Sequence, residues 1–493
     1  MKKVFLILAT AFVCTTSWAQ GNSESDFDKY SKKAKAGDAH AMNELGALYY
    51  KQQDYAKARE WFAKAAEKKN KASMAWLGEL YYKGYGVEKN YAEAYKWYKA
   101  SIEKDPDYAH GYRKIGDIYR TGGLGIQQDN QKAFEWYTIA AEKGNASAMR
   151  QLGFLYGEGE GVPQDYNKAF EWYVKAAEKG NVSSMNELGV LYYYGRGVIQ
   201  DYKKAFDWFS KAAEKGSASS MSWLGVLYYN GYGVEKNYSE AYKWHKAAID
   251  NGKNTGFNNY AIGDIYHTGG YGVEQDYKKA MEWWKKAAEK ENDDAMNRIG
   301  VLYHDGKGVP QDYAEAMKWY KMADEKGSDW APRNIGVLYF DGNGVSQSYE
   351  EALKWFKKAA DRGNADAISA IGYMYYEGKG VPKDYKKAFE WMSKSAEKGN
   401  DQSIGRLAEM YYYGYHVEKD YNKAFKMAKE AAEKDGSKSG TAMRILSACY
   451  RYGLGGAPKD NEKAKYWLEE SAKHKDEIAE RLFEQLNIEP IFQ

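Results

Sequence analysis

Residues 181–216 read NVSSMNELGVLYYYGRGVIQDYKKAFDWFSKAAEKG and contain two stretches with the spacing of an amphipathic helix. Apolar residues recur three and four positions apart in both, at Met185, Leu188 and Tyr192 and then at Phe206, Phe209 and Ala213. This spacing places each set on one stripe of a helix. The segment therefore predicts a pair of helices, here named helix A and helix B.

Glycines and an aspartate predict where the two helices begin and end. Gly195 and Gly197 lie between the stripes, and glycine adopts the left-handed conformation that ends a helix. Asp201 is suited to cap the first turn of helix B, because its carboxylate can accept a backbone N–H. Gly216 marks the expected end of helix B.

The pair is repeated along the chain. The tryptophan of an A-x-x-W-like segment recurs at Trp61, Trp97, Trp136, Trp172, Trp208, Trp244, Trp283, Trp319, Trp355, Trp391 and Trp467, with Met427 in the remaining slot. Most intervals are 36 residues, a period typical of repeat proteins that stack one supersecondary unit on the next. We expect twelve repeats over residues 38–475. A longer match, of 76–122 with 223–269, indicates duplication of a larger block.

The repeat resembles the Sel-one-like repeat family, a relative of the tetratricopeptide repeat. The matching residues are the L-G-x-L-Y of 188–192, the G-x-G-V of 195–198 and the K-A-x-x-W of 204–208. The resemblance implies an all-α, right-handed α-α superhelix, or solenoid, with helix A lining its concave surface. It also implies an adaptor role in multiprotein assemblies.

The beginning of the chain predicts export. Lys2 and Lys3 precede an apolar run over 4–13, and a small-residue site follows at 17–19. This order is typical of a cleaved signal peptide, here residues 1–19. The apolar run is too short to span a bilayer. We therefore expect a periplasmic or extracellular protein without an integral membrane segment after cleavage.

The ends and the cysteines complete the expected organisation. Residues 20–37 are expected to form an N-terminal capping helix, and residues 476–493 a C-terminal capping helix and tail. Such caps cover the apolar face that a terminal repeat cannot bury against a neighbour. Once Cys14 is removed with the signal peptide, Cys449 remains alone and cannot form an internal disulfide. Packing must therefore stabilise the fold.

One glycine near the middle of helix A serves as a reference position. It is Gly189 in the quoted repeat and recurs in ten of the twelve repeats. Because a mid-helix glycine costs about 1 kcal/mol relative to alanine, we expect helix B to cross there at close range with its tryptophan. The minus 4, minus 1, plus 2 and plus 3 positions vary little in character and form the expected core face.

The minus 3, plus 1 and plus 4 positions lie off that face and vary from repeat to repeat. The candidate binding residues at minus 3 and plus 4 are Asn43, Tyr82, Arg113, Arg120, Arg150, Asn186, Tyr193, Tyr229, Tyr260, His267, Asn297, His304, Arg333, Phe340 and Tyr376. Aromatic and arginine side chains are common anchors of protein interfaces. At minus 3 we expect exposure. At plus 4 two interpretations stay open, a binding groove or packing against the next repeat.

The sequence contains no motif of a catalytic, cofactor or metal site. The G-x-G pairs lie between helices and lack the following Lys-Ser or Lys-Thr of a phosphate-binding loop. Histidine and cysteine do not cluster at metal-ligand spacing. One branch of the resembled family, associated with β-lactam hydrolysis, carries a cysteine pair in each repeat, and this chain does not. We therefore expect no enzyme activity, no cofactor and no metal.

The leading hypothesis is an exported scaffold that binds an extended protein or peptide along the helix-A surface. The net charge of +3, with both signs interspersed, argues against a nucleic-acid partner. The alternative is a carbohydrate, of the cell wall or another polysaccharide, stacked on the tyrosines.

Overall fold

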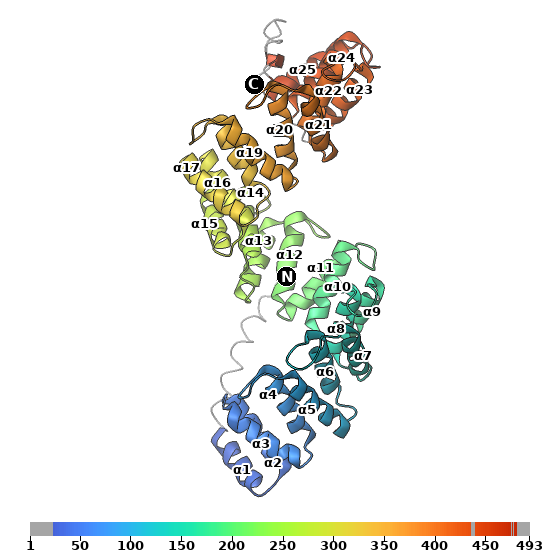
Figure 1. Cartoon of the computed structure of the whole chain (residues 1–493), viewed down its shortest axis with the longest axis vertical. Helices are drawn as coiled ribbons and strands as arrows, with labels where there is room; N and C mark the ends of the chain where they lie inside the picture. The colour runs from blue at the N-terminus through green and yellow to red at the C-terminus, as the bar shows by residue number, and fades with distance from the viewer. Residues whose placement is uncertain (1–22, 435–438, 475, 477, 481–493) are drawn as a thin grey trace. The chain divides into compact units, whose positions relative to one another are not determined.

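The computed structural model describes residues 23–434, 439–474, 476 and 478–480. Within these residues the chain forms 25 α-helices, and the β-structure is confined to two isolated bridges, Gly123 with Ile126 and Gly270 with Val273 (Figure 1). The predicted all-α solenoid of two-helix repeats is confirmed. The predicted signal peptide lies outside the described residues, as does most of the predicted C-terminal cap.

The chain divides into two compact units, up to Gly252 and from Lys253 onward. The first unit contains α1 (Ser23–Lys35), α2 (Ala39–Lys51), α3 (Tyr55–Glu67), α4 (Lys71–Lys83), α5 (Tyr91–Lys104), α6 (Ala109–Thr121), α7 (Asn130–Glu142), α8 (Ala146–Glu158), α9 (Tyr166–Glu178), α10 (Val182–Tyr194), α11 (Tyr202–Glu214), α12 (Ala218–Asn230) and α13 (Tyr238–Asp250).

The second unit has the same organisation. It contains α14 (Gly256–Thr268), α15 (Tyr277–Ala288), α16 (Asp293–Asp305), α17 (Tyr313–Glu325), α18 (Ala331–Asp341), α19 (Tyr349–Asp361), α20 (Ala365–Glu377), α21 (Tyr385–Glu397), α22 (Asp401–Tyr413), α23 (Tyr421–Glu433), α24 (Gly440–Tyr452) and α25 (Asn461–Lys473). From α2 onward, even-numbered helices are helix A of a repeat and odd-numbered helices are helix B.

The quoted repeat shows why the chain folds in this way. Asn181 caps α10 by accepting the backbone N–H of Ser184, and α10 ends at Gly195, which is left-handed with φ of 69°. Asp201 caps α11 by accepting the N–H of Lys204. The caps satisfy N–H groups that a helix leaves unpaired at its start. The predicted end of helix A and the predicted start of helix B are confirmed here.

The mid-helix glycine has the steric role expected of it, with a different partner. A Cβ added to Gly189 would lie 2.5 Å from the ring of Phe209, which follows Trp208 in α11. Gly46 meets Phe62 and Gly116 meets Tyr137 in the same manner. The expectation that the tryptophan crosses there is wrong. The residue after it points to helix A, because neighbours in a helix differ by about 100° in direction.

The core is built repeat by repeat. Met185, Leu188 and Leu191 of α10 are buried and pack against Tyr173 of the preceding α9 and Ala212 of α11. Each helix A is thus held between two B helices. Met185 and Leu188 of the predicted stripe are buried, whereas Tyr192 at plus 3 is only half-buried. Cys449 takes a core position in α24 and is fully buried.

Neighbouring repeats also join through stacked tyrosines near the loops between helices. Tyr55 stacks on Tyr85 with ring centres 4.7 Å apart. Two further pairs repeat this arrangement, Tyr202 with Tyr232 and Tyr385 with Tyr415. In each pair the first ring opens helix B of one repeat and the second belongs to the glycine-rich loop of the next. These contacts add to the packing between the repeats concerned. No described helix is long and apolar enough to cross a membrane.

Candidate functional site

The helix-A face is defined here as the minus 3, minus 2, plus 1 and plus 4 positions of the A helices within each unit. The asparagines at minus 3 lie at contacts between repeats. Asn43 accepts a hydrogen bond of 2.9 Å from the Ser73 hydroxyl of the next helix A. Asn186 accepts from Ser220 in the same way, also at 2.9 Å.

The expected exposure is wrong for two of these asparagines. Asn43 is buried, and so is Asn297, whose Oδ1 accepts from the Asn334 amide of the next helix A at 2.9 Å. Asn186 is half-buried. The reason is that the following helix A approaches this side of the helix and covers a short side chain there. These asparagines link repeats to one another.

The longer minus 3 residues remain half-buried at the surface of the helix-A face. Arg113 forms an ion pair of 2.5 Å with Asp117, one turn later on α6. Arg150 and Arg333 each donate to the residue that follows them, at 3.2 and 3.1 Å. Neither has a carboxylate partner in the described part of the chain. Tyr260 is half-buried, and desolvation raises its pKa to about 12.

The plus 4 aromatic candidates pack within their own repeats. Each contacts the tyrosine that opens helix B, with ring centres 4.9 to 5.4 Å apart. The pairs are Tyr82–Tyr91, Tyr193–Tyr202, Tyr229–Tyr238, His267–Tyr277, His304–Tyr313, Phe340–Tyr349 and Tyr376–Tyr385. Several also reach the next repeat, as Tyr193 does at Trp223. Packing against the next repeat, one of the two interpretations left open, is thus seen for some of these rings, whereas the contact that all of them share lies within their own repeat.

Partial exposure still leaves most plus 4 side chains available on the surface. Tyr376 is the exception, with 7% exposure beneath the guanidinium of Arg406. For Tyr376 the expected groove position is wrong, because the next repeat covers the ring. Arg120, whose helix B does not open with tyrosine, lies instead 5.7 Å from the ring centre of Phe154 on the next helix A. The binding role of the remaining candidates stays a prediction.

A hollow of about 450 Å³ opens on the helix-A face of the first unit, across α2, α4 and α6. We name it the Trp76 hollow, after the indole in its wall. Its other lining residues are Tyr50, Lys71, Ala72, Ala75, Glu79, Tyr108, His110 and Lys114. Glu79 is paired with Lys114 at 2.6 Å. Burial favours the neutral form of Glu79, but the bonds from Lys114 and Tyr98 hold its pKa below the ordinary value.

A larger depression of about 740 Å³ lies in the second unit. We name it the Arg333 trough. It crosses four successive A helices, with Arg333 on α18, Ser369 and Tyr373 on α20, Arg406 on α22 and Thr441 on α24. At its far end α22 packs directly against α24. Gly405 permits this approach, because a Cβ there would collide with Ser439.

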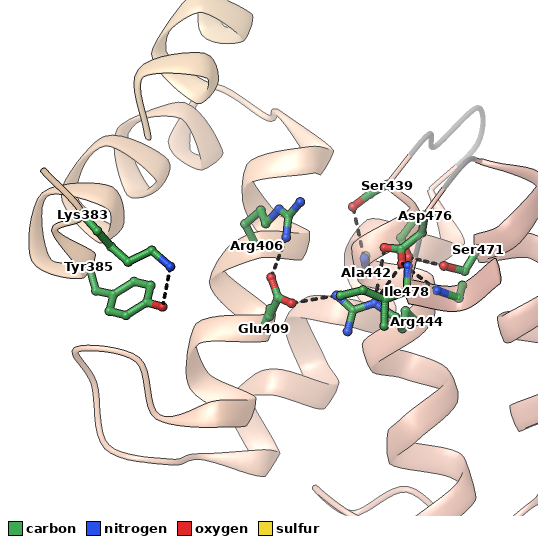
Figure 2. Close-up of polar contacts among 12 residues, drawn as sticks. Lys383, Tyr385, Arg406, Glu409, Ser439, Ala442, Arg444, Ser471, Asp476 and Ile478 are labelled. Carbon is green, nitrogen blue, oxygen red and sulfur yellow. Dashed lines mark hydrogen bonds and ion pairs between the residues drawn. The ribbon is translucent and has the colours of Figure 1, made fainter. Parts of the chain in front are cut away.

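A buried chain of charges supports the wall of the trough (Figure 2). Glu409 accepts from Arg406 at 2.8 Å and from Arg444 at 2.7 Å. Arg444, only 4% exposed, reaches on to Asp476 at 3.1 Å. The two arginines hold the pKa of Glu409 below its ordinary value although burial acts in the opposite direction. Because positive and negative side chains alternate in this row, all four can remain ionised inside the protein.

Of the residues that line these two depressions, reasoning from the sequence placed Arg333 at minus 3 and Tyr50 at plus 4 of the variable surface, and only Arg333 was among the candidate binding residues. It missed a feature that both depressions share, which is a small residue at minus 3. Ala75 occupies this position in α4 and Ser369 occupies it in α20, where seven other repeats carry arginine or asparagine. The position is also small in α12 and α22, which carry Ser222 and Gly405. The signal was present in the sequence as a change of side-chain size within a variable position. No group of three or more potential metal ligands lies together in the residues that the structure describes.

Comparison with known protein families shows to which family the chain belongs. The model of the Sel1 repeat matches eleven segments, 71–106, 109–145, 146–181, 182–217, 218–253, 259–292, 293–328, 333–364, 365–400, 402–436 and 440–476. The chain belongs to the Sel1 repeat family. A tetratricopeptide repeat model matches 23–73, at the start of the array. The resemblance drawn from the quoted repeat is confirmed.

Known Sel1 repeat proteins resemble the chain to different extents. The crystal structure of c5321, a protective antigen of uropathogenic Escherichia coli with an SLR fold, is 31% identical and has a TM-score of 0.71. The match covers 95% of this chain and 98% of that one. HRD3B of Arabidopsis thaliana, an ERAD-associated E3 ubiquitin-protein ligase component, is 34% identical over 111 residues. These are 21% of this chain and 17% of HRD3B.

A shorter match links the chain to HcpC of Helicobacter pylori strain J99, which is named as a provisional beta-lactamase. The two are 50% identical over 46 residues, 9% of this chain and 16% of HcpC. The chain therefore spans less than a fifth of the length of the curated relatives HRD3B and HcpC.

Proposed function

We propose that this Sel1 repeat protein is a non-catalytic scaffold that binds an extended polypeptide partner along its helix-A face. The family acts in protein interaction, and the name of HRD3B describes a component of a larger assembly. The observation that carries the proposal is the Arg333 trough, because it runs continuously across four A helices. We further propose that the protein acts outside the cytoplasm, in the periplasm or beyond the cell, after removal of residues 1–19.

The dimensions of the trough suit an extended chain. Packed helices lie about 10 Å apart, so a groove across four of them is about 30 Å long. An extended polypeptide advances about 3.3 Å per residue and would place about nine residues there. A preformed groove of this length lowers the ordering cost of binding, because the scaffold itself does not have to change shape.

The trough presents side chains of both charges to a partner. Among the residues that the structure describes, Arg333 and Lys379 lie on it without a carboxylate partner, and Asp366 and Glu377 lie on it without a cationic one. Lys379 is held over the ring of Tyr373, 5.2 Å from its centre. An aromatic face orients a cation without neutralising it. The trough therefore favours a polar segment that carries both acidic and basic residues.

Site-specific crosslinking tests this proposal. A photoreactive amino acid placed at Gln402, an exposed residue of the trough, should crosslink a protein partner in the native cell. The same group at Tyr466, exposed on α25, is the matched control and should not. Ser369→Arg fills the trough with a side chain that other repeats carry at minus 3, and should reduce the Gln402 crosslink at least fivefold. Equal crosslinking from Tyr466, or no effect of Ser369→Arg, would contradict the proposal.

Carbohydrate binding is the second candidate, favoured by exposed rings in the first unit. Tyr194 and Tyr232 are 50% and 38% exposed and lie beside Tyr193. Sugar rings could stack on such a cluster. Retention of the protein on cell-wall or polysaccharide fractions, lost in Tyr193→Ala and Tyr229→Ala, would support this candidate. If no protein partner co-purified as well, the polypeptide proposal would be replaced.

A further inference from the structure

The Trp76 hollow has a preformed aromatic wall. One side of the Trp76 indole is stacked on Phe62, with ring centres 5.5 Å apart and planes inclined by 4°. Tyr50 leans against the same indole at 4.8 Å. The indole also lines the hollow and is half-buried. Because Phe62 covers one face and Tyr50 fixes the orientation, the remainder of the ring is a rigid platform for a flat ligand group.

Small residues provide the room beside this platform. Ala75 replaces the asparagine or arginine found at minus 3 in the repeats on either side, Asn43 and Arg113. Ala72 lies on the same side of α4, one turn earlier. The resulting volume of about 450 Å³ is within the range of pockets that bury a small ligand or a large side chain.

A carboxylate acceptor is available at the edge of the platform. Glu79 lies one helical turn after Trp76 on α4 and lines the same hollow. Both of its internal bonds, from Tyr98 at 2.7 Å and from Lys114 at 2.6 Å, end on Oε2. Oε1 has no hydrogen bond within the described residues. The internal ion pair leaves no net charge to be neutralised, so the hollow suits an uncharged group that donates one hydrogen bond.

We propose that the Trp76 hollow is the anchoring pocket for one tryptophan or tyrosine side chain of the extended polypeptide partner. This inference rests on the proposed function and adds the identity of a residue that the partner must carry. The ring of the partner stacks on Trp76, and its indole N–H or phenol O–H donates to Oε1 of Glu79. Aromatic anchors seated in a preformed pocket commonly contribute most of the affinity of an interface.

The first unit contains a second aromatic cluster that serves as a matched control. Trp223 stacks on Phe209 at 5.5 Å, and Tyr193 leans on it at 4.9 Å. These distances match those around Trp76. Val226 replaces Glu79 in this cluster, one turn after the tryptophan. The second cluster therefore has the aromatic wall without the acceptor, and we expect it not to select a donor-bearing ring.

Fluorine NMR of a small probe tests the pocket in the whole chain. The probe is N-acetyl-5-fluorotryptophanamide, whose signal broadens when it binds and is unaffected by the 16 tryptophans of the protein. Its 1-methyl analogue lacks the N–H and should bind about fivefold more weakly, through the loss of one hydrogen bond. Trp76→Leu should reduce binding of the probe at least tenfold, while Trp223→Leu should leave it unchanged.

A second variant separates a lost pocket from a lost fold. Ala75→Arg introduces the residue that α6 carries at the same position, so the repeat should fold, and it should abolish probe binding by filling the hollow. Circular dichroism checks that Trp76→Leu and Ala75→Arg are both folded. Equal binding of the methyl analogue, an equal loss in Trp223→Leu, or displacement of the probe by N-acetylglucosamine would overturn the proposal. These outcomes are independent of Gln402 crosslinking, which tests the proposed function in the other unit.

Discussion

At the scale of single residues, the glycine in the middle of helix A is set by the aromatic ring that crosses it. We predict that Gly189→Ala destabilises its repeat by about 1–3 kcal/mol, because the new Cβ would collide with Phe209 and overpacking outweighs the gain in helix propensity. Gly157→Ala is the matched control. Its Cβ would meet only Ala169, at 3.8 Å, so we expect stabilisation by about 0.5–1 kcal/mol.

Native-state hydrogen exchange can measure both glycine variants locally. The amides of α10 and α11 report on Gly189→Ala, and those of α8 and α9 on Gly157→Ala. Equal changes in both variants would mean that helix propensity, rather than the crossing ring, determines the requirement for glycine.

Cys449 provides a second prediction at the residue scale. It occupies a position where most repeats carry leucine, and burial raises the pKa of its thiol to about 12. A raised pKa keeps the group protonated at neutral pH, and the thiolate is the reactive form. In a Cys14→Ser chain, we expect a disulfide reagent at pH 8 to label Cys449 at least about a thousandfold more slowly than a free thiol. Rapid labelling of Cys449 in the native chain would contradict this expectation. In the denatured chain Cys449 should react as fast as a free thiol.

At the scale of elements, Arg444 joins α24 to α22 and to the segment after α25. Replacement by methionine leaves Glu409 and Asp476 without their shared partner, and we predict a loss of about 3–5 kcal/mol in the stability of α24 and α25. Arg444→Lys keeps the charge but cannot reach both carboxylates with a planar fork. It should therefore also destabilise, by less. Limited proteolysis after α23 would detect the change, and an unaffected Arg444→Met would refute the structural role of the ion pairs.

The same charges predict how the last repeats respond to acid. The arginines hold the pKa of Glu409 below its ordinary value of 4.5. A carboxyl group whose pKa is lower in the folded state stabilises the fold above the unfolded value and loses this contribution as pH falls through the folded value. We expect the stability of α22 and α24 to decline below pH 4.5. In Glu409→Gln, stability at neutral pH should be lower and the acid-dependent decline smaller, as thermal melts between pH 3 and 7 can measure.

The elements also show which features could be predicted from the sequence. The helix pair, its cap at Asp201 and its termination at Gly195 depend on residues close together in the chain, and local spacing was sufficient. The burial of Asn43 and Asn297 depends on the next repeat. A map of one isolated helix cannot show that a neighbouring helix covers the minus 3 position. The Trp76 hollow and the Arg333 trough depend on differences between successive repeats, which averaging over repeats conceals.

At the scale of the whole molecule, stability is distributed over many small cores. Each described helix packs mainly on its neighbours in sequence, so stability is approximately a sum over repeats and their interfaces. No single core of the 493-residue chain has to form all at once. Such an arrangement allows one repeat to vary its surface, as at Ala75 or Ser369, without altering the packing of distant repeats.

This additivity predicts unfolding in several steps. We expect urea transitions followed by circular dichroism and by hydrogen exchange of individual repeats not to coincide, in contrast to a two-state domain. Gly189→Ala should shift the transition of α10 and α11 while that of α24 and α25 stays in place, and Arg444→Lys should do the reverse. Sites more than 10 Å apart with no shared partner usually contribute independently. A single coincident transition that both variants shift equally would contradict this prediction, because it would mean that the repeats unfold as one cooperative body. A local change at the Trp76 hollow would then affect binding throughout the chain.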